Sequence, residues 1–138
     1  MHGTIVRPTL ALLVGIAVGM LGHQVLIAQP AQTTCGKLQQ RDLEGVPGWE
    51  VIMFCSDPDP GEVIGRHYHP GPEFFYVLEG AVTIEPDGQP PFTVRAGESG
   101  YTGRKQIHNT KNASSTQPAK LIGFMVLEKG QPLMTPVP

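Results

Sequence analysis

Short runs of alternating apolar and polar residues recur along this chain, and most are closed by glycine, proline, asparagine or aspartate. Such runs predict β-strands, because alternate side chains of a strand face opposite sides of a sheet. Residues 81–85 and 92–95 flank a loop that contains proline and glycine, and they predict a hairpin. We expect the remaining strands around His67, in segments 49–56, 74–79, 106–110 and 121–128, and briefly around Tyr101.

The last residues break this pattern. Residues 130–138 contain three prolines, and we expect them to form an irregular tail outside any sheet. No internal repeat is present, and we expect no helix beyond the N-terminal segment. Short strands joined by many tight turns predict an all-β domain, either a sandwich or a barrel.

The pattern of the N-terminal segment predicts an export signal. Arg7 precedes an apolar run from Leu10 to Leu21, which is apolar on every face, unlike the stripe of a buried helix. Residues 1–28 fit a cleaved signal peptide, although Leu26 stands where a small residue is expected before the cut. They also fit an uncleaved signal anchor, because the apolar residues together approach the roughly 20 that span a bilayer.

Either interpretation places the domain outside the cytoplasm, in the periplasm or anchored to the outer side of the membrane. Residues 29–36 are rich in glutamine, proline and threonine and predict a linker. Residues 37–138 then form a single domain, with enough chain for a small barrel. Membrane contact is expected only through the N-terminal segment, if it is not cleaved.

Composition narrows the function classes. Charged residues make up 16% of the chain, while 17 glycines and 14 prolines supply many turns. The formal net charge is −2, and no basic stripe is present. Nucleic-acid binding is therefore not expected, because the chain offers no positive field for a phosphate backbone.

The two cysteines, Cys35 and Cys55, are an even pair in a chain that we expect to be exported. An oxidising compartment permits a disulfide between them, which would tie the N-terminal strand to the next strand. The alternative fits equally well: Cys55 is a small buried residue and Cys35 is a linker thiol.

Three of the five histidines, His67, His69 and His108, lie outside the N-terminal segment, and all three belong to one proposed cluster. His67 and His69 stand two apart, so a strand would point both imidazoles to the same face. Glu73 follows a Pro-Gly-Pro turn, and His108 is the obvious further donor from a later strand. On the spacing of His67 and His69 alone, hydrogen-bonded barrel residues are the better interpretation. With Glu73, His108 and the surrounding glycines, a metal site is the better one.

These residues resemble the first motif of the cupin family, G-x5-H-x-H-x3-E-x6-G. The sequence matches every defined position, at Gly61, His67, His69, Glu73 and Gly80. The second cupin motif, G-x5-P-x-G-x2-H-x3-N, is matched at Gly97, His108 and Asn112. Gly103 stands where proline is usual and Lys105 where glycine is usual, so the departures concern the loop and not the ligands.

The resemblance implies a single-domain jelly-roll barrel, often a homodimer, that holds one divalent metal ion. The implied ligands are His67, His69, Glu73 and His108. This imidazole and carboxylate set suits Fe, Mn, Ni, Cu or Zn and argues against calcium. Four protein ligands leave positions on the metal open for a small-molecule substrate or ligand.

Strand alternation indicates what surrounds the ligands. If Glu73 points inward, Phe75 and Val77 also do, as core residues, while Phe74 and Tyr76 face outward toward a second sheet or a partner. Gln106, Thr110 and Asn112 share the face of His108. Gln106 and Thr110 are candidates for hydrogen bonds around the site, although filling the barrel is the simpler role.

Three functions remain open. The first is a metal-dependent oxidoreductase, most plausibly a dioxygenase similar to the quercetinase-like cupins. The second is a metal enzyme without redox chemistry, such as an isomerase, a lyase or a hydrolase. The third is a binding or sensing module without turnover. The choice of a dioxygenase rests on analogy, because one fold hosts many chemistries, and no catalytic acid or base is assigned.

Overall fold

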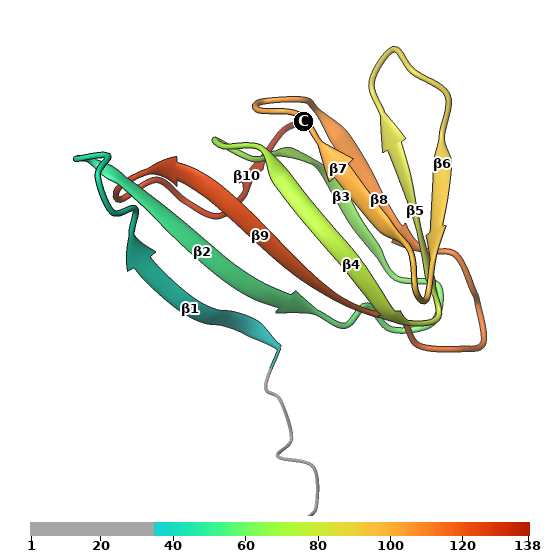
Figure 1. Cartoon of the computed structure of the whole chain (residues 1–138). Helices are drawn as coiled ribbons and strands as arrows, with labels where there is room; N and C mark the ends of the chain where they lie inside the picture. The colour runs from blue at the N-terminus through green and yellow to red at the C-terminus, as the bar shows by residue number, and fades with distance from the viewer. Residues whose placement is uncertain (1–34) are drawn as a thin grey trace, which may run out of the picture. The chain divides into compact units, whose positions relative to one another are not determined.

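The computed structural model describes residues 35–138 and shows ten β-strands (Figure 1). The expected signal peptide or anchor and almost all of the expected linker lie outside the described residues. No helix within residues 35–138 has the length and hydropathy needed to cross a membrane. The strands are β1 (Gly36–Asp42), β2 (Trp49–Ser56), β3 (Val63–Tyr68), β4 (Glu73–Glu79), β5 (Ala81–Pro86), β6 (Phe92–Arg95), β7 (Ser99–Thr102), β8 (His108–Asn112), β9 (Lys120–Glu128) and β10 (Thr135–Pro136).

The strands form two five-stranded antiparallel sheets. One sheet has the order β1-β2-β9-β4-β7, and the other has the order β10-β3-β8-β5-β6. Most successive elements alternate between these sheets after the β1–β2 hairpin, so that strands far apart in sequence become neighbours (Figure 1). The all-β jelly-roll expectation is confirmed, as is the hairpin of β5 and β6, in which Ala81 pairs with Arg95.

The hydrophobic core lies between the two sheets. Alternate residues of β4 are buried, with Phe75 and Val77 inward and Phe74 and Tyr76 outward, as the alternation predicts. The core combines residues of both sheets: Ile52, Phe54, Phe75, Val77, Ala119, Leu121, Met125 and Leu127 with Val82, Ile84 and Val94. Burial of these side chains is what holds the sheets face to face.

The C-terminal segment differs from the expectation. Thr135 and Pro136 form β10, which pairs with Tyr68 and His67 of β3, so the prediction of a tail outside any sheet is wrong. β10 is an edge strand, where a proline is tolerated because its missing N–H leaves no gap within a ladder. The next amide, from Val137, donates to the Arg66 carbonyl over 3.0 Å.

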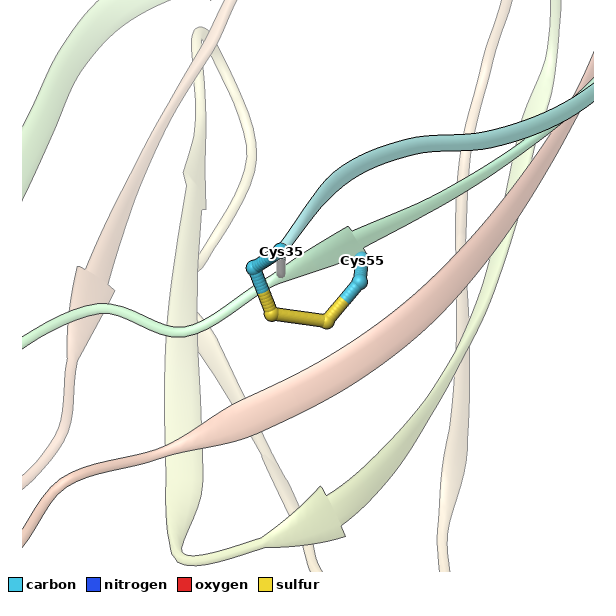
Figure 2. Close-up of a disulfide and its surroundings, with 2 residues drawn as sticks. All are labelled: Cys35 and Cys55. Atoms are coloured by element: carbon cyan, nitrogen blue, oxygen red, sulfur yellow. A yellow bond between two sulfur atoms is a disulfide. The ribbon is translucent and has the colours of Figure 1, made fainter. Parts of the chain in front are cut away.

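A disulfide joins Cys35 to Cys55, as Figure 2 shows. Cys55 lies in β2 opposite Gly36, so the bond fixes the start of β1 to its only partner strand. β1 is an edge strand whose residues are mostly exposed, and it contributes no side chain to the core. The disulfide therefore reinforces a strand that core packing does not hold.

The loop before β8 contains the one described non-glycine residue with positive φ. Lys105 has φ of 56°, and its amide donates to the His69 carbonyl over 2.9 Å. This is the position where the second motif usually has glycine. Lys105 keeps the left-handed conformation although its side chain disfavours it, because the loop geometry and the hydrogen bond from its amide hold it there.

We expect replacement of both cysteines by serine to lower the free energy of unfolding by about 3 kcal/mol, because the crosslink restricts the unfolded chain. Urea titrations of the wild type with and without reductant, beside the double variant Cys35→Ser/Cys55→Ser, measure this difference. An oxidised wild type that unfolds at the same urea concentration as the double variant contradicts the expectation.

We expect Lys105→Gly to raise the free energy of unfolding by about 0.5–1 kcal/mol, since relief of left-handed strain outweighs the extra entropy of glycine in the unfolded chain. Lys105→Ala is the matched control: it removes the same exposed side chain but keeps the strain, so it should give no gain. Equal stability of the glycine and alanine variants would show that the loop is not strained.

Candidate metal centre

The four candidate ligands come together between the two sheets. His67 lies in β3 and His69 directly follows it, while His108 opens β8 and pairs with His67 in the register. Glu73 opens β4 in the opposite sheet. Each residue is buried, with an exposed fraction between 1% and 7%.

Backbone carbonyls orient the three imidazoles. The Nδ1 atoms of His67, His69 and His108 lie 2.7, 2.8 and 2.9 Å from the carbonyl oxygens of Gly65, Leu133 and Gln106. A carbonyl only accepts, so each Nδ1 carries the proton that it donates. In a neutral ring, this arrangement leaves the lone pair on Nε2.

The three rings face one another. Their centroids are 4.3–5.2 Å apart, and one ligand nitrogen from each ring lies within 4.8 Å of the other two. The Nε2 atom of His108 is buried without any hydrogen-bond partner among residues 35–138. An unsatisfied buried nitrogen is costly and requires an explanation, such as an ion or water.

Glu73 faces the same cluster from the other sheet. Its Oε2 atom lies 3.3 Å from Nε2 of His69 and accepts a hydrogen bond of 2.7 Å from the Thr102 hydroxyl. Thr102 pairs with Glu73 in the β4–β7 register and is 1% exposed. Sequence reasoning missed Thr102. A short strand was expected around Tyr101, but the sequence did not indicate which face of that strand would lie beside the site.

Burial and charge set the protonation of the cluster in opposite directions. Burial lowers the pKa of His67 to about 4 and lowers the pKa of His108 below its ordinary value, so both rings are neutral near pH 7. Burial also opposes charge on His69, but the hydrogen bond and charge of Glu73 raise the pKa of His69. Burial would raise the pKa of Glu73, yet His69 holds it below its usual range. Both shifts favour a proton on His69 beside an ionised Glu73, and a metal ion would compete with that proton.

The donor set fits a divalent transition metal. The set consists of three imidazoles, each held by a backbone carbonyl, and one carboxylate. It therefore offers nitrogen and oxygen ligands and no thiolate. The carbonyl bonds to Nδ1 are the usual supports of metal-binding histidines. The orphaned Nε2 of His108 points to a missing partner at the centre of the cluster.

A cavity of about 450 Å³ opens beside the cluster. His67, His69 and Glu73 form its polar part, and Thr110 adds a hydroxyl. Most of the remaining wall is apolar. It comprises Phe54, Cys55, Ser56, Ile64, Leu121, Leu133 and Met134.

The residues expected beside the ligands have different roles. Thr110 lines the cavity as expected. The Gln106 side chain accepts a hydrogen bond from the Gly103 amide, and the backbone carbonyl of Gln106 accepts one from Nδ1 of His108. Asn112 is buried and donates to the carbonyls of Pro58, Asp59 and Gln117, which joins two loops.

The C-terminal contribution was missed by sequence reasoning. Leu133 gives its carbonyl to His69 and its side chain to the cavity, and Met134 lies beside it. The segment was expected to be irregular and outside the sheets, so no residue in it was a candidate. The segment lies close to the histidine cluster because β10 pairs with β3, and no local sequence pattern predicts this pairing.

Comparison with known proteins connects this arrangement to a family. The family model described as "Cupin domain" matches residues 56–127. None of the curated protein sequences compared with the chain matches it.

Solved structures share the fold. An oxalate oxidase in complex with glycolate has a TM-score of 0.53 at 23% identity, and the match covers 64% of this chain and 52% of that chain. A cupin-like protein from Thermotoga maritima has a TM-score of 0.55 at 19% identity, covering 75% and 74%. The DMSP lyase DddQ from Ruegeria pomeroyi has a TM-score of 0.56 at 16% identity, covering 63% and 43%.

The matched region spans only about half of the oxalate oxidase chain and less than half of the lyase chain. At these identities, the similarity shows the fold and not the activity. The family match includes all four candidate ligands: His67 on β3, His69 directly after it, Glu73 on β4 and His108 on β8. Because that match covers more than half of the sequence, the chain belongs to the cupin family.

Proposed function

We propose that this cupin is a metal-dependent enzyme that acts on a small organic molecule. His67, His69, His108 and Glu73 hold one divalent transition metal ion. The observation that carries the proposal is the buried Nε2 of His108, which has no partner while two further imidazoles face it. Three rings held by carbonyls and aimed at one another are costly to assemble unless a cation satisfies them.

Residues of the chain prepare the site. The carbonyls of Gly65, Gln106 and Leu133 keep each Nδ1 protonated, and Thr102 holds the Glu73 carboxylate in place. The apolar cavity wall limits water around the open side of the cluster. When bound, the metal supplies a Lewis acid or a redox centre to a substrate in the cavity.

Oxidation of the substrate by dioxygen is the reaction class that we propose. The cavity lining contains no lysine, arginine, tyrosine or aspartate, and its one carboxylate is engaged by His69 and Thr102. Acid–base chemistry by side chains therefore has few groups to use, which favours chemistry at a redox metal such as Fe, Mn, Ni or Cu. A non-redox zinc enzyme and a binding module without turnover are the alternatives.

We further propose that the protein is exported. The apolar N-terminal run supports this proposal, and the Cys35–Cys55 disulfide is consistent with an oxidising compartment. The proposal leaves both a periplasmic domain and a membrane-anchored domain open.

We propose a homodimer formed through the outer face of the β1-β2-β9-β4-β7 sheet. Several directly paired outward residues on this face are aromatic or aliphatic: Phe74 with Tyr101 and Phe124, Tyr76 with Ile122, and Val51 with Val126. Polar partners lie at the two edge strands, where Tyr76 also pairs with Ser99 and Val51 with Arg41. Phe74, Tyr76, Tyr101 and Phe124 are 44–55% exposed. Such a contiguous apolar face favours burial against a partner.

Charge supports a second copy as that partner. The outer face of the other sheet is polar, with ion pairs between Arg66 and Asp87 and between Lys111 and Glu85. On the apolar face, charges stand toward the ends and the edge: Glu79 pairs with Lys120, Arg104 contacts Glu128, and Arg41 pairs with Val51 on the edge strand β1. An uncharged centre with both signs at its ends is compatible with its own copy in a twofold interface.

We expect His67→Ala and Glu73→Ala to lose most of the bound metal while the fold is retained, because each removes a donor but no core residue. Elemental analysis of protein purified without chelators or a histidine tag measures metal per chain, and circular dichroism verifies the fold. Asn109→Ala is the control, since Asn109 neighbours His108 but bonds Gly65 and Glu85. Full metal content in both ligand variants contradicts the assignment.

We expect Phe124→Glu to convert the dimer to a monomer, because a buried charge without a partner is costly. Sedimentation velocity of the wild type and variant measures the change. Thr83→Glu places the same charge on the polar sheet and should leave the dimer intact. A wild type that is monomeric at every concentration contradicts the proposed interface.

A further inference from the structure

The cavity beside the metal cluster has two chemically different parts. Its inner part is the polar group of His67, His69 and Glu73. Its walls come from both sheets and from the C-terminal segment, with Phe54 and Leu121 on one side, Ile64 on the other, and Leu133 with Met134 between β9 and β10. A molecule that fills this space must combine one polar end with an apolar body.

The cavity offers little to an anion. None of the eleven lining residues is lysine or arginine, and Glu73 supplies the one carboxylate. An anionic group away from the cluster would be buried against apolar side chains without a cationic partner, which is costly. Thr110 and Ser56 can instead exchange hydrogen bonds with uncharged groups.

Charge balance at the cluster leads to the same preference. A divalent ion with three neutral imidazoles and the Glu73 carboxylate carries a net charge of about +1. One oxygen donor with at most a single negative charge balances it. A small dianion leaves negative charge in excess and leaves most of the apolar wall unfilled.

The size of the cavity agrees with a larger ligand. Its volume of about 450 Å³ lies within the range of sites that bury drug-sized molecules. The C-terminal segment forms part of the wall and is fixed there, because the Leu133 carbonyl accepts from Nδ1 of His69 and Val137 donates to Arg66. Met134 is 40% exposed, which places it at the mouth.

We infer that the cavity selects an uncharged, mainly apolar organic molecule that presents a single hydroxyl or carbonyl oxygen to the His67–His69–Glu73 end, and that it discriminates against small dianions. Ile64, Leu121, Leu133 and Met134 form the wall that makes this selection. The inference rests on the proposed metal-dependent function and adds the class of substrate.

The test compares two probes on the zinc-loaded full chain. 1-Naphthol is an apolar alcohol, and oxalate is a small dianion. Calorimetry gives each dissociation constant, and methyl NMR of labelled leucine and methionine locates binding; dialysis confirms that zinc is retained. We expect 1-naphthol to bind at least about tenfold more tightly than oxalate, with shifts at Leu121, Leu133 and Met134. Tighter binding of oxalate would overturn the inference.

Variants place a cation in the wall. Ile64→Arg, or Met134→Arg if the first does not fold, should weaken 1-naphthol binding and strengthen oxalate binding, each by about tenfold. Val63→Arg adds the same charge at the neighbouring position, which is 56% exposed and outside the cavity lining, and it should change neither. Unchanged affinities in a folded cavity variant would overturn the inference.

Failure of the inference and failure of the proposed function are distinguishable. If zinc binds and oxalate is preferred, the metal site stands and the substrate class is wrong. If zinc does not bind, the proposed function fails, and 1-naphthol binding by the metal-free chain, located by the same methyl signals, still tests the apolar wall. Absence of those shifts in both forms would overturn the inference.

Discussion

Three hydrogen bonds from imidazole nitrogens to backbone carbonyls determine how the centre of this molecule is arranged. Their acceptors, the carbonyls of Gly65, Gln106 and Leu133, belong to β3, to the loop before β8 and to the C-terminal segment. Because main-chain atoms hold the rings, the strand register sets the direction of each Nε2. The arrangement of the candidate metal ligands is therefore a property of the sheet geometry, and side-chain substitutions elsewhere affect it only if they move these backbones.

Strands β2 and β9 contribute both to the packed core and to the wall of the cavity. Phe54 and Leu121 belong to the hydrophobic core and also line the cavity, so one apolar layer serves both. Gly123 permits this packing, because a Cβ atom there would lie 2.1 Å from the Phe54 ring. The outer edge of the aromatic ring occupies the space that a Cβ atom would take. A larger residue would move the ring, and the cavity wall would change with the core.

Sequence reasoning identified the elements whose signal is local. Alternation gave β2, β4, β5 and β9 because one face of each strand is buried, and the spacing of His67, His69 and Glu73 with His108 indicated residues that the fold does bring together. It missed Leu133 because a carbonyl contact has no side-chain signature. It also excluded the tail from the sheets on the basis of its prolines, although an edge strand tolerates them. Gln106 precedes β8, so alternation within the strand does not determine where its side chain points.

The strand β4 connects the interior chemistry to the outer surface. Glu73, Phe75 and Val77 point inward, while Phe74 and Tyr76 alternate with them on the apolar face. Burial of that outer face against a second copy would restrain the strand that positions Glu73, because backbone displacement would then have to disturb packing on both sides. Phe74 already contacts Tyr101, with ring centroids 4.9 Å apart, and Tyr101 adjoins Thr102, which holds the carboxylate. If the proposed dimer forms through this face, burial of the surface and the position of the Glu73 carboxylate would be coupled through one pair of neighbouring strands, β4 and β7.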